Sequence, residues 1–276
     1  MTDWLIAHED VIRLSVFFGL FAIFALTEHV RPLRILVLPR QFRWLTNLGL
    51  IAAGTALLRL ALPVLAVGAA WFAENAGIGL FAWVAVPYWA EVLLTLVLLD
   101  LFIYAQHVVF HHVPFLWRLH KIHHTDLDLD VTTALRFHPL EILISMGLKI
   151  IVVLVLGAPV AGVILFEMIL SGMALFNHSN WRLPPGLETV LRRAVVTPAM
   201  HIIHHSCHKT ETNSNYGFNL SCWDRLFGTY THRPQEGYEG ITLGLEDHRK
   251  IGDLGFWALL MMPFVPQDKP YKGGSL

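Results

Sequence analysis

The sequence has few charged residues and almost no cysteine. Charged residues make up 15% of its 276 positions and hydrophobic residues 55%, and the mean hydropathy is +0.53. Ordinary soluble domains carry about 25% charged residues, so this composition indicates an integral membrane protein. The two cysteines, Cys207 and Cys222, have neither a C-x-x-C nor a zinc-ribbon spacing. They do not indicate a disulfide framework, and their number excludes a structural cysteine–zinc site.

An excess of charge of one sign is also missing. The net charge is -1, the isoelectric point is about 7.0, and no block of lysine and arginine occurs, so we expect no nucleic-acid partner. The first ten residues, MTDWLIAHED, are acidic, whereas a cleaved secretory signal begins with basic residues. The apolar run at 11–28 is therefore predicted to be a retained membrane helix.

Long apolar runs are what the sequence does have. Those at 45–72 and 79–104 are long enough to cross a hydrocarbon layer about 30 Å thick. Two shorter runs, 142–156 and 160–176, flank a Gly-Ala-Pro turn and predict a hairpin. We predict an all-α integral membrane protein with about four transmembrane helices, including this short hairpin, and a cytoplasmic helical cap that holds a histidine-rich site for two metal ions. As a single domain over 1–276 it would consist of transmembrane helices within 11–104, a first histidine-rich region at 105–141, the hairpin at 142–176, a second histidine-rich region at 177–232 and a tail at 233–276.

Orientation follows from the arginines. The connector after the first run carries Arg31, Arg34, Arg40 and Arg43, and cytoplasmic loops are enriched in positive charge. If this connector is cytoplasmic, the number of predicted membrane crossings that follow it places every histidine run on the cytoplasmic face. We therefore expect a bacterial inner-membrane protein, or one of the endoplasmic reticulum in a eukaryote, with its site facing the cytoplasm.

Sixteen histidines occur, and half of them fall in three short runs. A buried imidazole leaves a polar group to satisfy, whereas a neutral ring offers a lone pair to a metal ion. The H-x-x-x-H and H-x-x-H-H spacings place imidazoles on one face of a helix about a turn apart. The three runs supply eight candidate ligands, four for each of two ions: His107, His111, His120, His123, His124, His201, His204 and His205.

Two further polar residues precede the first run. Asp100 and Tyr104 fall on the same helical stripe as His107 and His111. An aspartate inside a membrane helix costs about 2.5–3.5 kcal/mol and is commonly functional. We predict that Asp100 accepts the outer ring proton of a ligand histidine and that Tyr104 lies beside it.

Ligand type does not select the metal, because imidazole suits iron, zinc and copper alike. Eight or nine nitrogen ligands for two ions, with room for water or O2 as well, exceed the four ligands that each tetrahedral zinc ion takes, which favours iron. H-E-x-x-H and E-x-x-H are both absent, so the motifs of metalloproteases and ferritin-like carboxylate proteins are excluded.

Several motifs occur in one order between about residues 88 and 232: LWRLHKIHHT, TALRFHPLE, FNHSNWRLP, ETNSNYGFN and WDRLFGTY. In these the chain resembles the fatty acid hydroxylase / sterol desaturase superfamily of membrane non-haem di-iron oxygenases. The resemblance implies that the eight histidines bind two iron ions that activate O2. It also implies that His178 is a further ligand and that His138 is a ligand or supports one. Ala174 stands where fatty acid 2-hydroxylases have a histidine, so the pattern is more similar to sterol desaturase-like and alkylglycerol monooxygenase-like members, especially compact bacterial ones.

We therefore expect an oxygenase that hydroxylates or desaturates a lipid: a sterol, a fatty acyl chain or an ether lipid. The sequence contains no cysteine cluster and no G-x-G-x-x-G motif opening a helix, so electrons are expected from a separate reductase or small carrier. Two other functions stay open. A haem-b membrane electron carrier would show a Soret band, and a histidine-rich metal transporter would move metal ions into vesicles.

Overall fold

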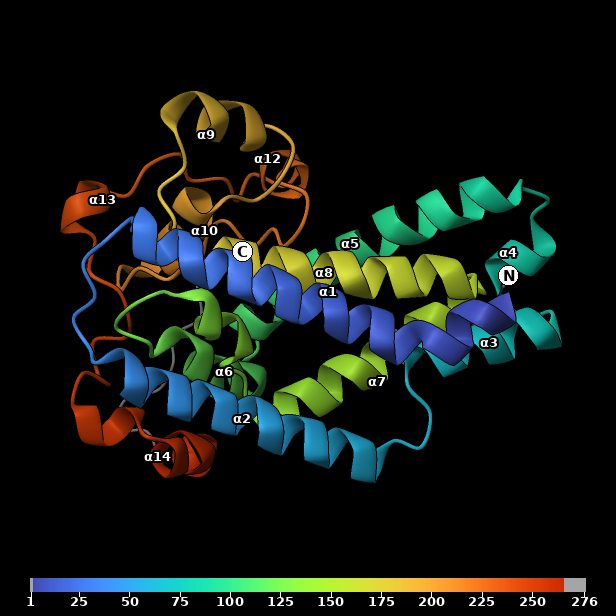
Figure 1. Cartoon of the computed structure of the whole chain (residues 1–276), viewed down its shortest axis with the longest axis horizontal. Coiled ribbons are helices and arrows are strands. Elements are labelled where there is room, and N and C mark those ends of the chain that lie inside the picture. Colours follow the sequence, from blue (N-terminus) through green and yellow to red (C-terminus); the bar gives the residue numbers. More distant parts are fainter. Residues whose placement is uncertain (1, 266–276) are drawn as a thin grey trace.

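The structure is a computed structural model that describes residues 2–265, and it contains no β-strand within that range. Five long helices form its body (Figure 1). They are α1 (Thr2–Val30), α2 (Arg40–Ala61), α5 (Tyr88–His112), α7 (Pro139–Leu156) and α8 (Val160–His178). The predicted all-α class is confirmed.

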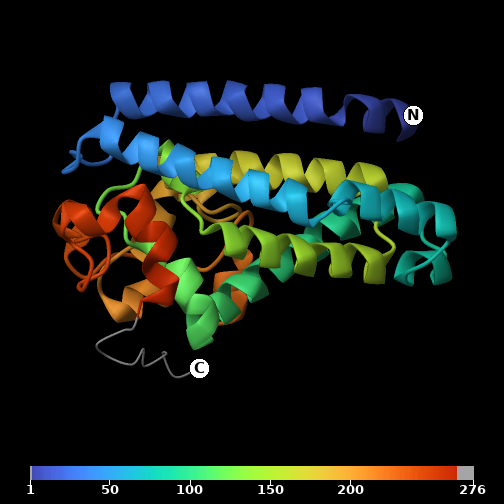
Figure 2. The ribbon, with the colours of Figure 1, turned by 90° about the horizontal axis from the view of Figure 1, so that it is seen from below.

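The long helices run back and forth along the long axis of the molecule. Figures 1 and 2 show that α1, α5 and α8 end at the same end of the bundle at which α2 and α7 begin. Helix α8 packs against α1 and α5, and α2 packs against α7. Seen from below, α1 forms an outer layer over α2 and α8 (Figure 2).

Five segments are long and apolar enough to cross a membrane, where about four were expected. The predicted run at 45–72 is not one continuous helix, because α2 ends at Ala61 and α3 (Ala66–Ala76) begins after a break at Pro63. A proline lacks the N–H that a helix interior needs. After α4 (Leu80–Trp83) the chain restarts at Pro87, as predicted, and α5 continues past the predicted end at 104.

The opposite end of the bundle is a tight turn. Gly157 ends α7 with φ of 64° and Gly79 precedes α4 with φ of 98°. A Cβ atom on Gly79 would lie 2.2 Å from the backbone nitrogen of Gly157. The two loops therefore approach each other so closely that a residue with a Cβ atom does not fit at position 79.

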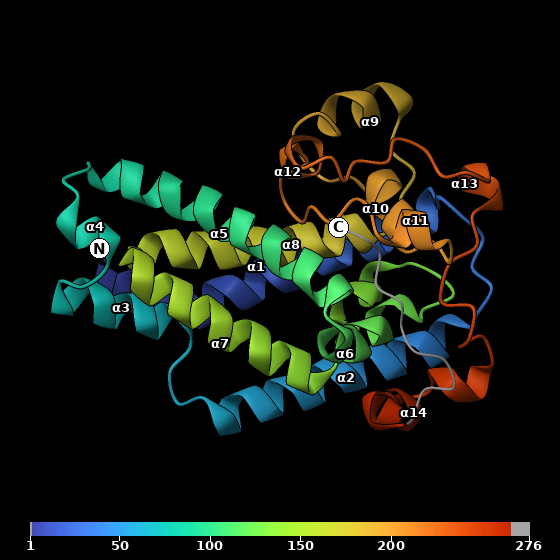
Figure 3. The ribbon, with the colours of Figure 1, turned by 180° about the vertical axis from the view of Figure 1, so that it is seen from behind.

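The short helices gather at the other end and form the cap (Figure 3). They are α6 (Pro114–His124), η1 (Val131–Leu135), α9 (Pro185–Leu191), α10 (Pro198–His204), α11 (Lys209–Thr212), α12 (Cys222–Leu226), α13 (Gly237–Gly240), η2 (Ile251–Leu254), α14 (Phe256–Met261) and η3 (Met262–Phe264). The apolar segment of the tail, α14 and η3, also lies here, where Phe256 packs on Gly49 of α2.

A buried polar network fixes the segment that follows α6. The guanidinium of Arg43 donates to both carboxylate oxygens of Asp126, at 2.8 and 2.9 Å, and also pairs with Asp130. Arg136 donates to Asn47 on α2 and to the carbonyl oxygen of Ile122 on α6. These bonds tie the histidine-bearing α6 to the membrane helix α2.

Candidate metal centre

The first two candidate histidines lie on the last turns of α5. His107 and His111 are buried, and Asp100 and Tyr104 are buried on the same helix. The stripe predicted from their spacing is therefore present. It faces the cap, where α6 and α10 bring the other histidine runs.

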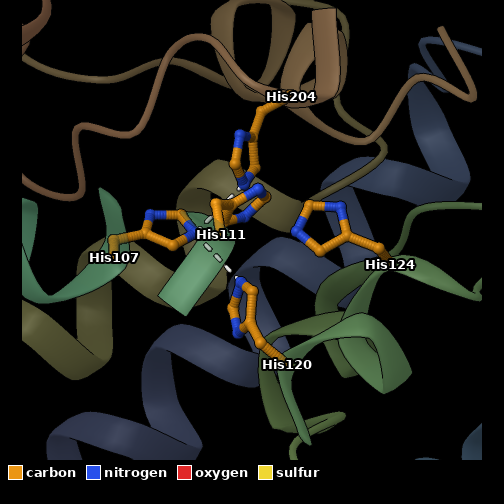
Figure 4. A group of neighbouring side chains, drawn as sticks. All are labelled: His107, His111, His120, His124 and His204. Atoms are coloured by element: carbon orange, nitrogen blue, oxygen red, sulfur yellow. Dashed lines mark hydrogen bonds between the residues drawn. The ribbon is translucent and has the colours of Figure 1, made fainter. Parts of the chain in front are cut away.

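The structure places nine histidines in two adjoining groups. Within each group, one nitrogen of every ring lies within 4.8 Å of the corresponding nitrogens of the others, and every member is buried. Figure 4 shows the five-histidine group, whose rings converge from α5, α6 and α10. It consists of His107, His111, His120, His124 and His204; the four-histidine group consists of His123, His178, His201 and His205.

Each H-x-x-H-H run contributes to both groups. In α6, His120 and His124 belong to the five-histidine group and His123 to the other. The run at α10 does the reverse, since His201 and His205 share the four-histidine group while His204 crosses over. Positions i and i+4 of each run thus belong to the same group, and position i+3 belongs to the group that contains positions i and i+4 of the other run.

Ring nitrogens within a group are very close. In the five-histidine group the Nε2 atom of His107 lies 3.1 Å from that of His120 and 3.0 Å from that of His204. In the four-histidine group the Nε2 atom of His178 lies 3.0 Å from those of His123 and His201. The nitrogens of each group therefore point at a centre of their own.

Backbone carbonyl oxygens fix the tautomer of three rings. The Nδ1 atoms of His107 and His204 donate to the carbonyl oxygens of Tyr216 and Ser214, each at 2.8 Å. His178 Nδ1 donates to the carbonyl oxygen of Ala174 at 2.7 Å. Because the proton of each neutral ring sits on Nδ1, its Nε2 carries a bare lone pair.

Burial keeps the cap histidines neutral. It lowers the pKa of His204 to about 3, and burial together with neighbouring imidazoles lowers the pKa of His123, His124 and His205 well below the usual value. Neutral rings with lone pairs 3.0 Å apart repel one another unless a cation lies between them. Both nitrogens of His124 are buried without a hydrogen-bond partner among the described residues. The donor set therefore fits two metal ions.

The sequence analysis did not identify the contact between Glu141 and His120. Glu141, on the first turn of α7, accepts a hydrogen bond from Nδ1 of His120 at 2.6 Å. It is the carboxylate partner of a candidate ligand. The available signal was a carboxylate at the start of an apolar helix, three residues after His138 in the HPLE motif.

The prediction for Asp100 was wrong. Its carboxylate accepts hydrogen bonds from the backbone nitrogens of Asn219 and Leu220, at 3.3 and 3.1 Å, and from Nε1 of Trp223 at 2.8 Å. Seven helical positions separate Asp100 from His107, about 10 Å along the axis. Asp100 therefore anchors the 219–223 segment rather than a ligand histidine.

His138 lies outside both groups. Its Nδ1 accepts a hydrogen bond from the backbone nitrogen of Leu140, and its Nε2 donates to the carbonyl oxygen of Leu260. The ligand assignment is wrong because both ring nitrogens are used. Instead the ring caps α7, and through Leu260 it attaches α14.

Tyr104 contacts the site through another aromatic ring. Its hydroxyl lies 2.9 Å from Oγ1 of Thr229, and its ring packs edge-on against Tyr216, which in turn packs against His107. The turn that carries Tyr216 is held by Asp224, which accepts from the backbone nitrogens of Tyr216 and Gly217. Tyr104 thus supports the turn that orients His107.

A cavity of about 210 Å³ adjoins both groups. His107, His120 and His123 line it together with apolar residues of α5, α7 and α8. The cavity therefore gives access to candidate ligands of both groups.

Comparison with known proteins agrees with this geometry. The fatty acid hydroxylase family model matches residues 92–229. The chain is 34% identical over 181 residues to ornithine lipid hydroxylase OlsE of Rhizobium tropici, which covers 64% of this chain and 51% of that protein. It is 30% identical over 139 residues to alkylglycerol monooxygenase of Homo sapiens (50% of this chain, 30% of that one). It is also 24% identical over 146 residues to cholesterol 25-hydroxylase of Rattus norvegicus (52% and 48%).

The chain therefore spans about half or less of the length of these curated relatives. No solved structure matches it.

Proposed function

Because the chain belongs to the fatty acid hydroxylase family, we propose that it is an integral membrane oxygenase that hydroxylates or desaturates a lipid with O2 and external electrons. The names of its relatives support a lipid substrate: an ornithine lipid hydroxylase, an alkylglycerol monooxygenase and a cholesterol 25-hydroxylase. We further propose that residues 1–276 act as one oxygenase domain.

The observation that carries the proposal is the pair of adjoining histidine groups. We assign as metal ligands the five and four residues of these groups, one ion to each group. A haem would use only two rings, whereas four or five converge in each group, which favours two separate ions over the haem carrier.

The number of ligands supports iron over zinc. Five imidazoles converge in one group and four in the other, whereas a tetrahedral zinc ion takes four ligands in all. Sites with this many nitrogen ligands and room for O2 suit the higher coordination number of iron.

The bound irons would supply the oxidant that breaks an unactivated C–H bond. Hydroxylation inserts one atom of O2 and reduces the other to water, with two electrons and two protons. Desaturation removes two hydrogen atoms and uses the same electrons and protons to form two waters.

The chain's own residues orient the ligands and exclude water. Glu141 and the carbonyl oxygens of Tyr216 and Ser214 hold the Nδ1 protons of three rings, which leaves Nε2 available to the metal. The burial of every ligand keeps the site dry. The cavity brings the reactive carbon beside His107 and His120.

We propose that the electrons come from a separate reductase or small carrier that docks on the cap. The arginine-rich connector at the same end of the bundle supports a cytoplasmic cap. The bacterial relative supports a place in a bacterial inner membrane.

The test compares the lipids of cells that express the wild-type chain with those of cells that express His204→Ala. The proposal expects a lipid that gains one oxygen or loses two hydrogens in the wild type only, and only when O2 is present. Identical lipid profiles under conditions in which the purified protein carries metal would contradict it.

A further inference from the structure

We propose that Glu141 and Gln106 form a hydrogen-bond acceptor site inside the cavity that binds a hydroxyl or amide N–H of the lipid. This site would place the oxidised carbon close to the polar headgroup. The inference rests on the proposed function and names the kind of substrate that the site accepts.

Glu141 has one oxygen to spare. Its Oε1 accepts from His120, whereas Oε2 is buried and has no hydrogen-bond partner among the described residues. The residue is 5% exposed and lines the cavity. A buried carboxylate oxygen without a partner is costly, so a ligand that donates a hydrogen bond to it gains accordingly.

Gln106 provides a second acceptor in the same cavity. Its Nε2 donates to Oγ of Ser145 at 2.9 Å, which links α5 to α7, while its Oε1 is buried and has no partner in the described part of the chain. Ser145 lies one turn after Glu141 on α7, and all three residues line the cavity. The side chains of Glu141, Gln106 and Ser145 therefore form one polar patch in the cavity wall, beside the imidazoles of His107 and His120.

The rest of the cavity is suited to a hydrocarbon chain. Lys149 lies eight positions after Glu141 on α7, about 12 Å along the axis. The ammonium group of Lys149 is held by Glu167 at 2.9 Å, so the lysine adds mainly methylene groups to the wall. The other lining residues away from the imidazoles are Ile103, Ile142, Met146, Leu170 and Phe218.

This polarity sets the direction in which a lipid binds. A lipid that entered with its tail toward the metal ions would leave the oxygens of Glu141 and Gln106 against hydrocarbon. With the donor group at the metal end, both oxygens gain partners and the chain lies toward Lys149. The carbon nearest the ions is then one within a few bonds of the donor group.

The test uses iron-loaded protein in lipid nanodiscs and two pairs of probes that differ only in the donor. One pair is 1-hexadecanol and its methyl ether; the other is N-methylpalmitamide and N,N-dimethylpalmitamide. In each pair the donor should bind about tenfold tighter to the wild type. A preference within one pair only identifies whether a hydroxyl or an amide is recognised.

Variants separate the two acceptors. In Glu141→Gln the amide oxygen can still accept from His120 while its NH2 group turns a donor toward the cavity, so the preference should disappear or reverse with both metal ions retained. Gln106→Leu should reduce it to about threefold, and Leu148→Ala, at an exposed position of α7 outside the cavity, should leave it unchanged. Equal affinity for both members of each pair in the wild type would overturn the inference, as would an unchanged preference in Glu141→Gln.

Failure of this inference is distinct from failure of the proposed function. Protein that carries two ions and oxidises lipid but binds the probes equally contradicts only the acceptor site. Should Glu141→Gln lose its metal, the wild-type probe pairs and Gln106→Leu still decide the outcome.

Discussion

The Nε2 atoms of His107 and His204 lie 3.0 Å apart, although both rings donate their Nδ1 protons to backbone carbonyl oxygens. Two bare lone pairs therefore face each other inside a buried group. A positive ion between them would turn this repulsion into two bonds, so we expect metal binding to stabilise the folded chain.

Loss of one such ligand should abolish turnover. His204→Ala removes a ring of the five-histidine group, so we expect less bound metal and oxygen-dependent turnover reduced by more than about 100-fold. Metal content and product formation measure this. His208→Ala is the matched control, because His208 lies near the surface and contacts Glu236 at 3.3 Å; equal loss in both variants would contradict the assignment.

The exchange between runs gives a prediction about pairs of ligands. His123 and His205 belong to one group although they come from different runs. Removing both should empty one site and leave about one ion per chain. His123→Ala combined with His204→Ala damages both groups and should leave less than one ion. The opposite order in metal analysis would mean that each run binds its own ion.

The carboxylate of Glu141 should control metal affinity at a distance. Glu141→Ala leaves the Nδ1 proton of His120 without its acceptor, so the affinity for the ion should fall about 10–100-fold. Competition with a chelator measures it. Ser145→Ala, one turn later on α7, should leave the affinity unchanged; a comparable fall there would indicate a general loss of structure.

A fourth prediction concerns stability. Arg43→Met leaves Asp126 and Asp130 buried without their cation, which should cost about 3–5 kcal/mol of the free energy of unfolding. Arg59→Met, on the same helix and 63% exposed, should change it by less than about 1 kcal/mol. Unfolding in detergent compares the two, and similar losses would show that the buried network is not the cause.

Local spacing predicted the parts of the site that lie on one helix. The stripe from Asp100 to His111 and the i, i+3, i+4 pattern of His120 to His124 follow from the 3.6-residue period. The bundle and the common end of the histidine runs followed from apolar length and the positions of arginines.

Contacts between distant segments could not be derived in this way. Glu141 meets His120 and Asp100 meets Trp223 only because the cap folds back on α5 and α7. The splitting of each run between the two groups depends on how α6 faces α10. Spacing within a run contains no information on the angle between these two helices. Nor does it show that Glu141, rather than Asp100, accepts the Nδ1 proton of a candidate ligand.

Quantitative metal analysis of the purified chain, expressed with iron and zinc both available, tests the central claim most directly. We predict about two iron ions per chain, lost progressively as members of the two histidine groups are replaced. A single zinc ion, or a full-length membrane-inserted protein that binds no metal at all, would contradict the account.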